Sequence, residues 1–172
     1  MKVVVAVAAL ALLAGCASPP QKTDAASAAP ISTAAPAPAA GGAASKSAMA
    51  KSAALWEAKG RLSATDPSVF FDYNQFNIKT QFHSTVSAFG NYLALDEKAR
   101  ITIEGNADER GTVEYNLALG QKRAEAVSIG LQAIGANPAR IEAVSNGEEK
   151  PRNKAKSETA FAENRRADLI LK

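Results

Sequence analysis

The side chains most suited to chemistry lie in one segment of the chain, Glu104–Val127, which reads EGNADERGTVEYNLALGQKRAEAV. It is rich in charged and polar groups that packing does not require, and these are candidates for a binding or catalytic site. Its acidic group, Asp108, Glu109 and Glu114, has no histidine or second base arranged beside it for proton transfer. The segment therefore indicates binding rather than catalysis.

Spacing alone also allows structural roles for these groups. Asp108 can close an Asx-type turn ahead of the helix that follows. Arg123 can form a surface ion pair with Asp108 or Glu109, which would contribute little. Arg165 and Arg166, near the end of the chain, can join the last strand to acidic loops, although ligand contact stays open for Arg165.

Composition excludes several classes of protein. The chain has one cysteine, Cys16, and one histidine, His83, so neither a disulfide nor a Cys/His metal site can form within it, and we expect no metal and no cofactor. Residues 1–55 hold four Lys and one Asp, whereas residues 56–172 hold sixteen basic and sixteen acidic side chains. Because the folded part is neutral, we expect no nucleic-acid partner.

The N-terminus predicts export and anchoring. Lys2 precedes the apolar stretch Val3–Gly15, which is too short to span a bilayer and is typical of a signal-peptide core. The stretch ends in Leu-Ala-Gly-Cys16, which resembles the lipobox of bacterial lipoproteins; the alternative is a plain secretory signal with a chance cysteine. The resemblance implies that Cys16 is lipidated, and Ala17, rather than Asp, implies transfer to the outer membrane.

The domain boundaries follow from composition. We predict a lipoprotein signal peptide at 1–15 and a folded domain at 55–172. Between them, residues 16–54 form the lipidated cysteine and a flexible tether rich in Ala, Pro and Ser. This segment has too few large apolar residues to offset the entropy of the chain.

Hydrophobic periodicity predicts strands alternating with helices over the folded part. The expected strands are Val69–Phe71, Ala99–Gly105, Ile141–Val144 and Asp168–Leu171. The expected helices are about Asn77–Leu95, a long helix from Thr112 as N-cap to Gly135 as stop, and a short helix from Ser157 as cap through Glu163. The apolar stripe of the long helix is Val113, Leu117, Gly120, Ala124, Val127, Leu131 and Ile134. The alternation indicates the α/β or α+β class, with one sheet covered by helices.

Three segments carry a resemblance to a known family: Glu104–Val127, Gly147–Pro151 (GEEKP) and Asn164–Leu169 (NRRADL). Together they resemble the OmpA-like peptidoglycan-binding domain, and within that family the peptidoglycan-associated lipoproteins (Pal). The resemblance covers about residues 69–172. It implies an α+β sandwich of order βαβαβ(α)β, with one mixed four-stranded sheet covered by helices, and no enzymatic activity.

The resemblance also implies a ligand and the residues that bind it. The ligand is the diaminopimelate residue of the peptidoglycan stem peptide, and the two positions that face it are Asp108 and Arg123. The tip of this ligand is a zwitterion, so a carboxylate can take its ammonium while a planar guanidinium takes its carboxylate. Further candidates are Arg110, Thr112, Asn74 and Arg165.

Three positions depart from the family pattern. Asn74 stands where many relatives have Asp, Asn106 replaces a His, and Asn146 replaces an aromatic residue before Gly147. The departure at Asn74 weakens the case for that residue as a ligand contact. We expect those at Asn106 and Asn146 to leave the binding of the zwitterion in place but to change how the rest of the stem or sugar is held.

The implied function is mechanical. An outer-membrane lipoprotein would hold the membrane to peptidoglycan, with TolB and other Tol proteins as partners, in support of envelope integrity and cell division. One alternative is an OmpA-like lipoprotein outside the Tol system. Another is a peptidoglycan hydrolase using Asp108 and Glu109, but adjacent residues on one loop are poorly suited to flank a glycosidic bond with carboxyls about 5 to 9 Å apart.

Overall fold

The computed structural model describes residues 41–172, with side chains from residue 46. The predicted signal peptide, Cys16 and most of the predicted tether lie outside the described residues. The elements in chain order are α1 (Gly41–Ser63), β1 (Ser68–Phe70), α2 (His83–Leu95), β2 (Ile101–Asn106), α3 (Val113–Ile134), β3 (Ile141–Gly147), α4 (Glu158–Asn164) and β4 (Arg166–Leu171). Two 3-10 turns, Thr80–Phe82 and Pro138–Arg140, precede α2 and β3.

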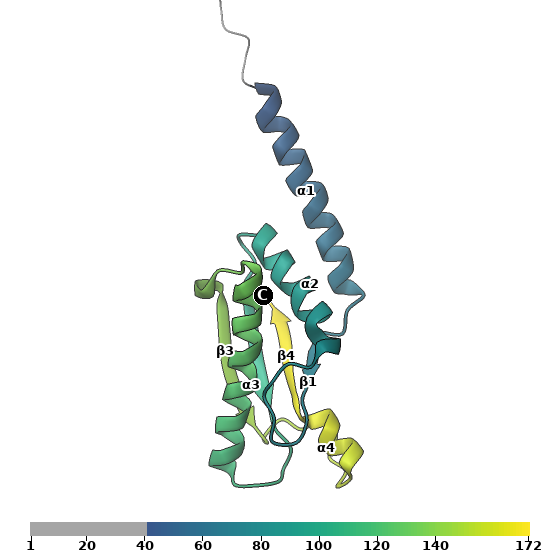
Figure 1. Cartoon of the computed structure of the whole chain (residues 1–172), viewed down its shortest axis with the longest axis vertical. Helices are drawn as coiled ribbons and strands as arrows, with labels where there is room; N and C mark the ends of the chain where they lie inside the picture. Colours follow the sequence, from purple (N-terminus) through teal and green to yellow (C-terminus); the bar gives the residue numbers. More distant parts are fainter. Residues whose placement is uncertain (1–40) are drawn as a thin grey trace, which may run out of the picture. The chain divides into compact units, whose positions relative to one another are not determined.

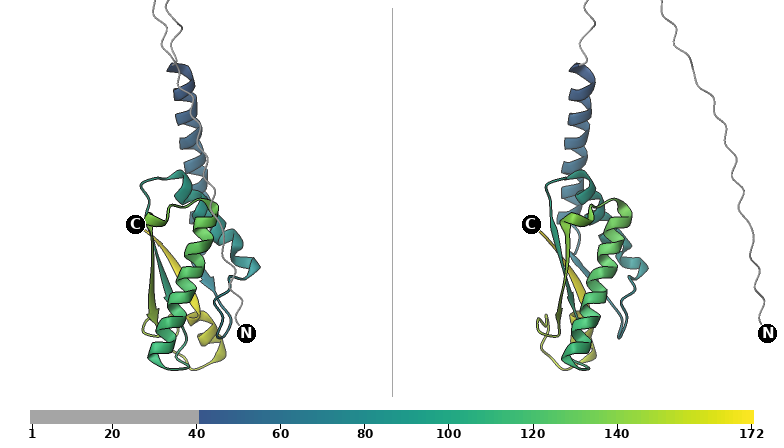
Figure 2. Two further views of the ribbon diagram at one scale, coloured as in Figure 1. Left: turned by 60° about the vertical axis from the view of Figure 1, so that its left-hand side comes forward. Right: turned by 90° about the vertical axis from the view of Figure 1, so that its left-hand side faces the viewer.

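The strands form one mixed sheet in the order β1-β4-β2-β3. Strands β2 and β3 are parallel, whereas β4 runs antiparallel to both β1 and β2. Helices α2 and α3 lie together on one face of this sheet, with α3 along β2 and β3 (Figures 1 and 2). The predicted α+β fold with a four-stranded mixed sheet is therefore confirmed.

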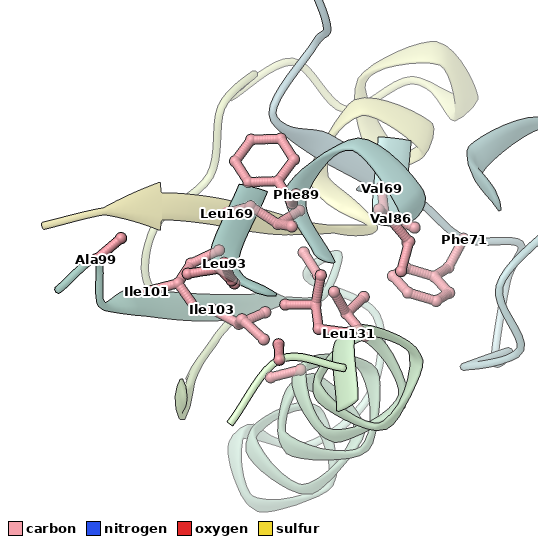
Figure 3. Close-up of a cluster of buried hydrophobic side chains, with 14 residues drawn as sticks. Val69, Phe71, Val86, Phe89, Leu93, Ala99, Ile101, Ile103, Leu131 and Leu169 are labelled. Atoms are coloured by element: carbon pink, nitrogen blue, oxygen red, sulfur yellow. The ribbon is translucent and has the colours of Figure 1, made fainter. Parts of the chain in front are cut away.

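The core lies between the sheet and these two helices. Ile101 and Ile103 of β2 point toward α2 and α3, and Leu169 joins them from β4 (Figure 3). Phe89 and Leu93 of α2 close the layer from the helix side, each 3% exposed or less. Burial of such side chains contributes roughly 1.5 to 3 kcal/mol each, so this layer is the main source of stability.

The first helix is a correction to the predicted tether. Helix α1 begins at Gly41, fourteen residues before the predicted domain edge at 55. No proline occurs between Pro38 and Pro67, and the segment is rich in Ala with Lys, Leu and Glu, which have high helix propensity. Helix α1 packs on α2, and Lys51 forms an ion pair with Glu97 at 2.6 Å. None of the described helices is long and apolar enough to cross a membrane.

Two further differences concern the helices on the sheet. Helix α2 begins at His83 rather than near Asn77. In α3 the predicted cap and stop are confirmed, because the Thr112 hydroxyl accepts from the Tyr115 amide and Gly135 adopts φ 114°. The predicted stripe is wrong in the first half of α3, where Val113 and Leu117 are about half exposed and polar residues face inward instead.

Two glycines set the distance between α3 and the sheet. A Cβ added to Gly105 of β2 would lie 1.9 Å from the carbonyl oxygen of Gly120 in α3. Because the clashing atom belongs to the backbone, it cannot rotate away. Helix and strand therefore approach more closely than a side chain at position 105 would allow, and this holds the first half of α3 against the end of β2.

We predict that Gly105→Ala lowers the free energy of unfolding by more than about 3 kcal/mol, because α3 must move off the sheet. Urea unfolding followed by circular dichroism measures this. The control is Gly60→Ala in α1, where an added Cβ meets no atom within 4 Å and the helix gains up to about 1 kcal/mol. An equal response of the two variants would contradict the close approach.

Candidate functional site

A small, charge-lined cavity lies where the β1–α2 loop, the β2–α3 loop and the start of α3 meet. Its volume is about 10 Å³, roughly the room that one water molecule needs. Its lining residues are Tyr73, Asn74, Asp108, Arg110, Tyr115, Asn116, Leu119, Arg123 and Arg165. The site thus combines one carboxylate with three guanidinium groups.

Among the residues that the structure describes, Asp108 is the only acid that lines this cavity, and it is 4% exposed. Its Oδ1 accepts the Arg110 backbone amide at 3.2 Å, which closes the predicted Asx-type turn. Its Oδ2 accepts from Arg110 Nη2 at 2.6 Å and from Arg165 Nη1 at 3.2 Å. Burial acts to raise the pKa of this carboxyl, but the hydrogen bonds outweigh it and hold the pKa below its ordinary value of 3.8. Asp108 is therefore ionised at neutral pH.

Arg123 is fully buried, and backbone oxygens hold it. Its Nε donates to the Gln75 carbonyl at 2.9 Å, Nη1 to that of Asn106 at 2.8 Å and Nη2 to that of Asp72 at 3.2 Å. A guanidinium has five N–H groups, so one on each Nη remains beyond these three bonds. Burial lowers the pKa of Arg123 to about 10, opposed by the nearby charge of Asp108, and the group stays cationic at neutral pH.

The other two arginines differ in how firmly they are held. Arg165 is nearly buried; it donates from Nε to the Phe71 carbonyl at 3.2 Å and pairs with both Asp108 and Glu158. Arg110 leaves 34% of its side chain exposed and lies between the rings of Tyr73 and Phe161, 4.3 and 4.7 Å from their centroids.

Asn74 adopts a left-handed backbone conformation with φ 55°, which asparagine tolerates better than most residues. Its side-chain oxygen accepts a hydrogen bond from the Tyr115 hydroxyl at the start of α3. This contact ties the β1–α2 loop to α3 across the cavity. Asn74 therefore shapes the wall of the cavity without adding a charge to it.

The two other departures from the family pattern lie away from the cavity. Asn146 donates to the Glu104 carboxylate at 2.8 Å and to the Asn106 side chain at 3.2 Å, on the face of the sheet opposite the helices. The Asn106 amide also reaches Asp168 at 3.4 Å, a long contact. Only the backbone oxygen of Asn106 is turned toward the site, where it accepts from Arg123.

The structure brings five of the predicted residues to one cavity: Asp108, Arg123, Arg110, Asn74 and Arg165. Thr112 is not among the lining residues, because its hydroxyl caps α3. The predicted surface ion pair of Arg123 is absent among the described residues, since Arg123 is buried against carbonyls. The family resemblance also implied that the strand-to-helix corner near 71–76 lines the site, and Tyr73 of this corner does so. The sequence interpretation missed the walls that α3 contributes, namely Tyr115, Asn116 and Leu119. The only available signal was that Tyr115 and Asn116 interrupt the apolar stripe of α3.

The arrangement is poorly suited to acid–base catalysis. A general acid must hold a proton near neutral pH, and the depressed pKa of Asp108 prevents this. Its neighbour Glu109 is half exposed and pairs with Lys156 at 3.5 Å. Within residues 41–172 no group of three or more His, Cys, Asp or Glu side chains is placed to hold a metal ion.

Fold and cavity together define an α+β domain with a small recess that presents fixed charges of both signs. Residues 70–165 match the OmpA family, and the chain belongs to this family. The resemblance seen in its sequence motifs is thereby confirmed.

Two curated relatives have the same name. The "Peptidoglycan-associated lipoprotein" of Pasteurella multocida (strain Pm70) is 41% identical over 102 residues, which cover 59% of this chain and 68% of the relative. That of Haemophilus influenzae is also 41% identical over 102 residues, 59% of this chain and 67% of the relative.

Solved structures agree with this assignment. The crystal structure of the peptidoglycan-associated lipoprotein from Burkholderia pseudomallei is 46% identical, with a TM-score of 0.61 over 62% of this chain and 90% of that one. The C-terminal domain of Helicobacter pylori MotB is 19% identical, with a TM-score of 0.58 over 63% of this chain and 84% of that one. At that identity the MotB likeness shows the fold alone.

We predict that Arg123→Met lowers the free energy of unfolding by about 3 kcal/mol or more, because three buried carbonyls lose their donor. Chemical denaturation measures this. The control is Lys122→Met, which also replaces a cation by methionine, one residue earlier on the exposed side of α3. Lys122 has only a distant contact with the Phe76 ring, at 5.6 Å, so this change should alter stability by less than about 0.5 kcal/mol. Equal stability of Arg123→Met and the unaltered chain would show that Arg123 does not hold the loop.

Proposed function

We propose that this domain binds peptidoglycan non-covalently, through the zwitterionic tip of the diaminopimelate residue in the stem peptide. The observation that supports it most is the cavity itself, in which one ionised carboxylate lies among three guanidinium groups. A ligand with one ammonium and one carboxylate at its tip matches this arrangement of charges. The names of the two curated relatives agree with the proposal.

Each charged group has a distinct role in the proposed complex. Asp108 takes the ligand's ammonium, since it is the only carboxylate in the cavity lining. Arg123 takes the ligand's carboxylate with the two N–H groups left on its Nη atoms, while the backbone carbonyls keep its guanidinium in place. Arg165 adds positive charge and fixes Asp108 from the other side. Arg110 lies at the open side of the cavity, and Asn74 shapes its wall.

At the level of the cell, the proposal is a tether between the outer membrane and the cell wall. Cys16 would carry the lipid anchor on the outer membrane, and residues 55–172 would face the periplasm and hold the wall. Many copies holding weakly would act together, because release of one leaves the others bound. The relatives' names, which describe lipoproteins associated with peptidoglycan, support this.

The chain would serve as the Pal component of the Tol system, with TolB as a partner, in envelope integrity and cell division. Support comes from the identity of about 41% to peptidoglycan-associated lipoproteins over the domain. The alternative is an OmpA-like lipoprotein that binds the wall outside the Tol system. Co-purification of the full chain with TolB from crosslinked cells separates the two.

We predict that Asp108→Asn reduces retention of the full chain on purified sacculi by about tenfold or more, because the neutral amide cannot form an ion pair with the ligand's ammonium. Sedimentation of the protein with sacculi measures this. The matched control is Glu125→Gln, which removes one carboxylate from the exposed side of α3, and it should be retained like the unaltered chain. Unchanged retention of a folded Asp108→Asn variant would remove the proposed site.

We further predict that retention on sacculi stays constant between about pH 5 and pH 8. The pKa of Asp108 is lowered in the folded chain, so its charge and the stability linked to it are fully present above 3.8. They are lost only as pH falls through the depressed value. Retention measured in buffers of constant ionic strength checks this, and a fall in retention centred above pH 5 would point to another group.

A further inference from the structure

Arg110 lies where the ligand's ammonium would have to bind. Its Nη2 is 2.6 Å from Asp108 Oδ2, and its backbone amide occupies Asp108 Oδ1. Arg165 Nη1 also donates a hydrogen bond to Oδ2, at 3.2 Å. Both oxygens of Asp108 are therefore engaged within the domain, and the cavity of about 10 Å³ leaves no room for a ligand side chain.

Of the three arginines in the cavity, Arg110 is the one that can leave. Arg123 and Arg165 are anchored by backbone carbonyls, and at most 7% of either side chain is exposed. Among the described residues, the Arg110 side chain donates to no carbonyl, and 34% of it is exposed. Its Nε is buried without a hydrogen-bond partner, so its present position leaves one polar group unsatisfied.

We propose that Arg110 is an internal substitute for the ligand's cation, and that stem peptides bind by displacing it from Asp108. This inference rests on the proposed function. Asp108 is buried, so the loss of one of its two cationic partners, with Arg165 alone remaining, is costly. Only a ligand that brings its own ammonium can replace Arg110, so the exchange selects for an amine at the tip of the stem.

The surroundings of Arg110 keep the free-energy cost of this exchange small. Its Nη1 already pairs with Glu158 at 3.1 Å, on the exposed side of the cavity. When Arg110 releases Asp108, the Glu158 pair and the rings of Tyr73 and Phe161 still offer it partners. The number of charge pairs is then unchanged, because the ligand's ammonium pairs with Asp108.

The proposal predicts the sign of a mutational effect. Suppose that Arg110 is away from Asp108 in only about a tenth of the molecules. The apparent affinity for the ligand is then about tenfold weaker than in a chain whose Asp108 is always free of Arg110. Arg110→Ala therefore tightens binding by about tenfold, whereas the loss of an ordinary ligand contact weakens it. The matched control is Arg61→Ala, which removes an arginine that pairs with Glu57 on the exposed side of α1.

The experiment is calorimetric titration of the full chain with the tripeptide L-Ala–D-Glu–meso-diaminopimelate, and with the same peptide acetylated on its side-chain amine. We expect Arg110→Ala to bind the free amine about tenfold more tightly than the unaltered chain or Arg61→Ala, and no form to bind the acetylated peptide. Equal or weaker binding by Arg110→Ala overturns the displacement and leaves the proposed function standing. Failure of the unaltered chain to bind the tripeptide overturns both.

A second measurement on the unaltered chain does not depend on how the variant folds. The Arg110 Nε–H resonance in a nitrogen-15 NMR spectrum should shift and lose its protection from solvent exchange when the tripeptide is added. The Arg123 Nε–H, held by the Gln75 carbonyl, serves as the internal reference and should stay protected. A bound spectrum with an unchanged Arg110 Nε–H overturns the proposal.

Discussion

The site depends on one buried cation. Arg123 projects from α3 and binds three backbone carbonyls, two from the β1–α2 loop and one from the end of β2. A buried guanidinium needs such partners. The loop in turn is held to α3 by the two bonds to Asp72 and Gln75 together with the hydrogen bond from the Tyr115 hydroxyl to Asn74. The position of the cavity wall therefore depends first on the electrostatic needs of Arg123.

The close approach of α3 to the sheet makes this arrangement possible. With glycines at 105 and 120 the backbones touch, and the start of α3 comes next to the end of β2. That places Asp108, in the loop between them, beside the arginines of α3 and of the α4–β4 junction. Burial of Asp108 acts to raise the pKa of its carboxyl, but the hydrogen bonds from Arg110 and Arg165 outweigh this and hold the pKa below its ordinary value.

Periodicity and end signals predicted most of the fold. Thr112, Gly135 and Ser157 mark helix ends because their local chemistry is independent of tertiary contacts. The start of α1 was missed because a composition rich in Ala and Ser is compatible with both helix and coil. Sequence motifs predicted that Asp108 and Arg123 belong to one site. They did not predict that Arg123 is buried. Which face of the first half of α3 turns inward depends on carbonyls far away in the sequence, and no local pattern reports them.

Helix α1 has a mechanical consequence. Any pull applied ahead of Gly41 reaches the sheet only through this 23-residue helix, whose described contacts are with α2 and the edge of the core. A helix stores chain at 1.5 Å per residue, whereas extended chain covers about 3.3 Å. Unwinding α1 thus lengthens the molecule by roughly 40 Å while leaving the β-sheet and its cavity intact. Helix α1 thus provides extra chain length that can be released between the attachment of the N-terminus and the ligand bound in the cavity.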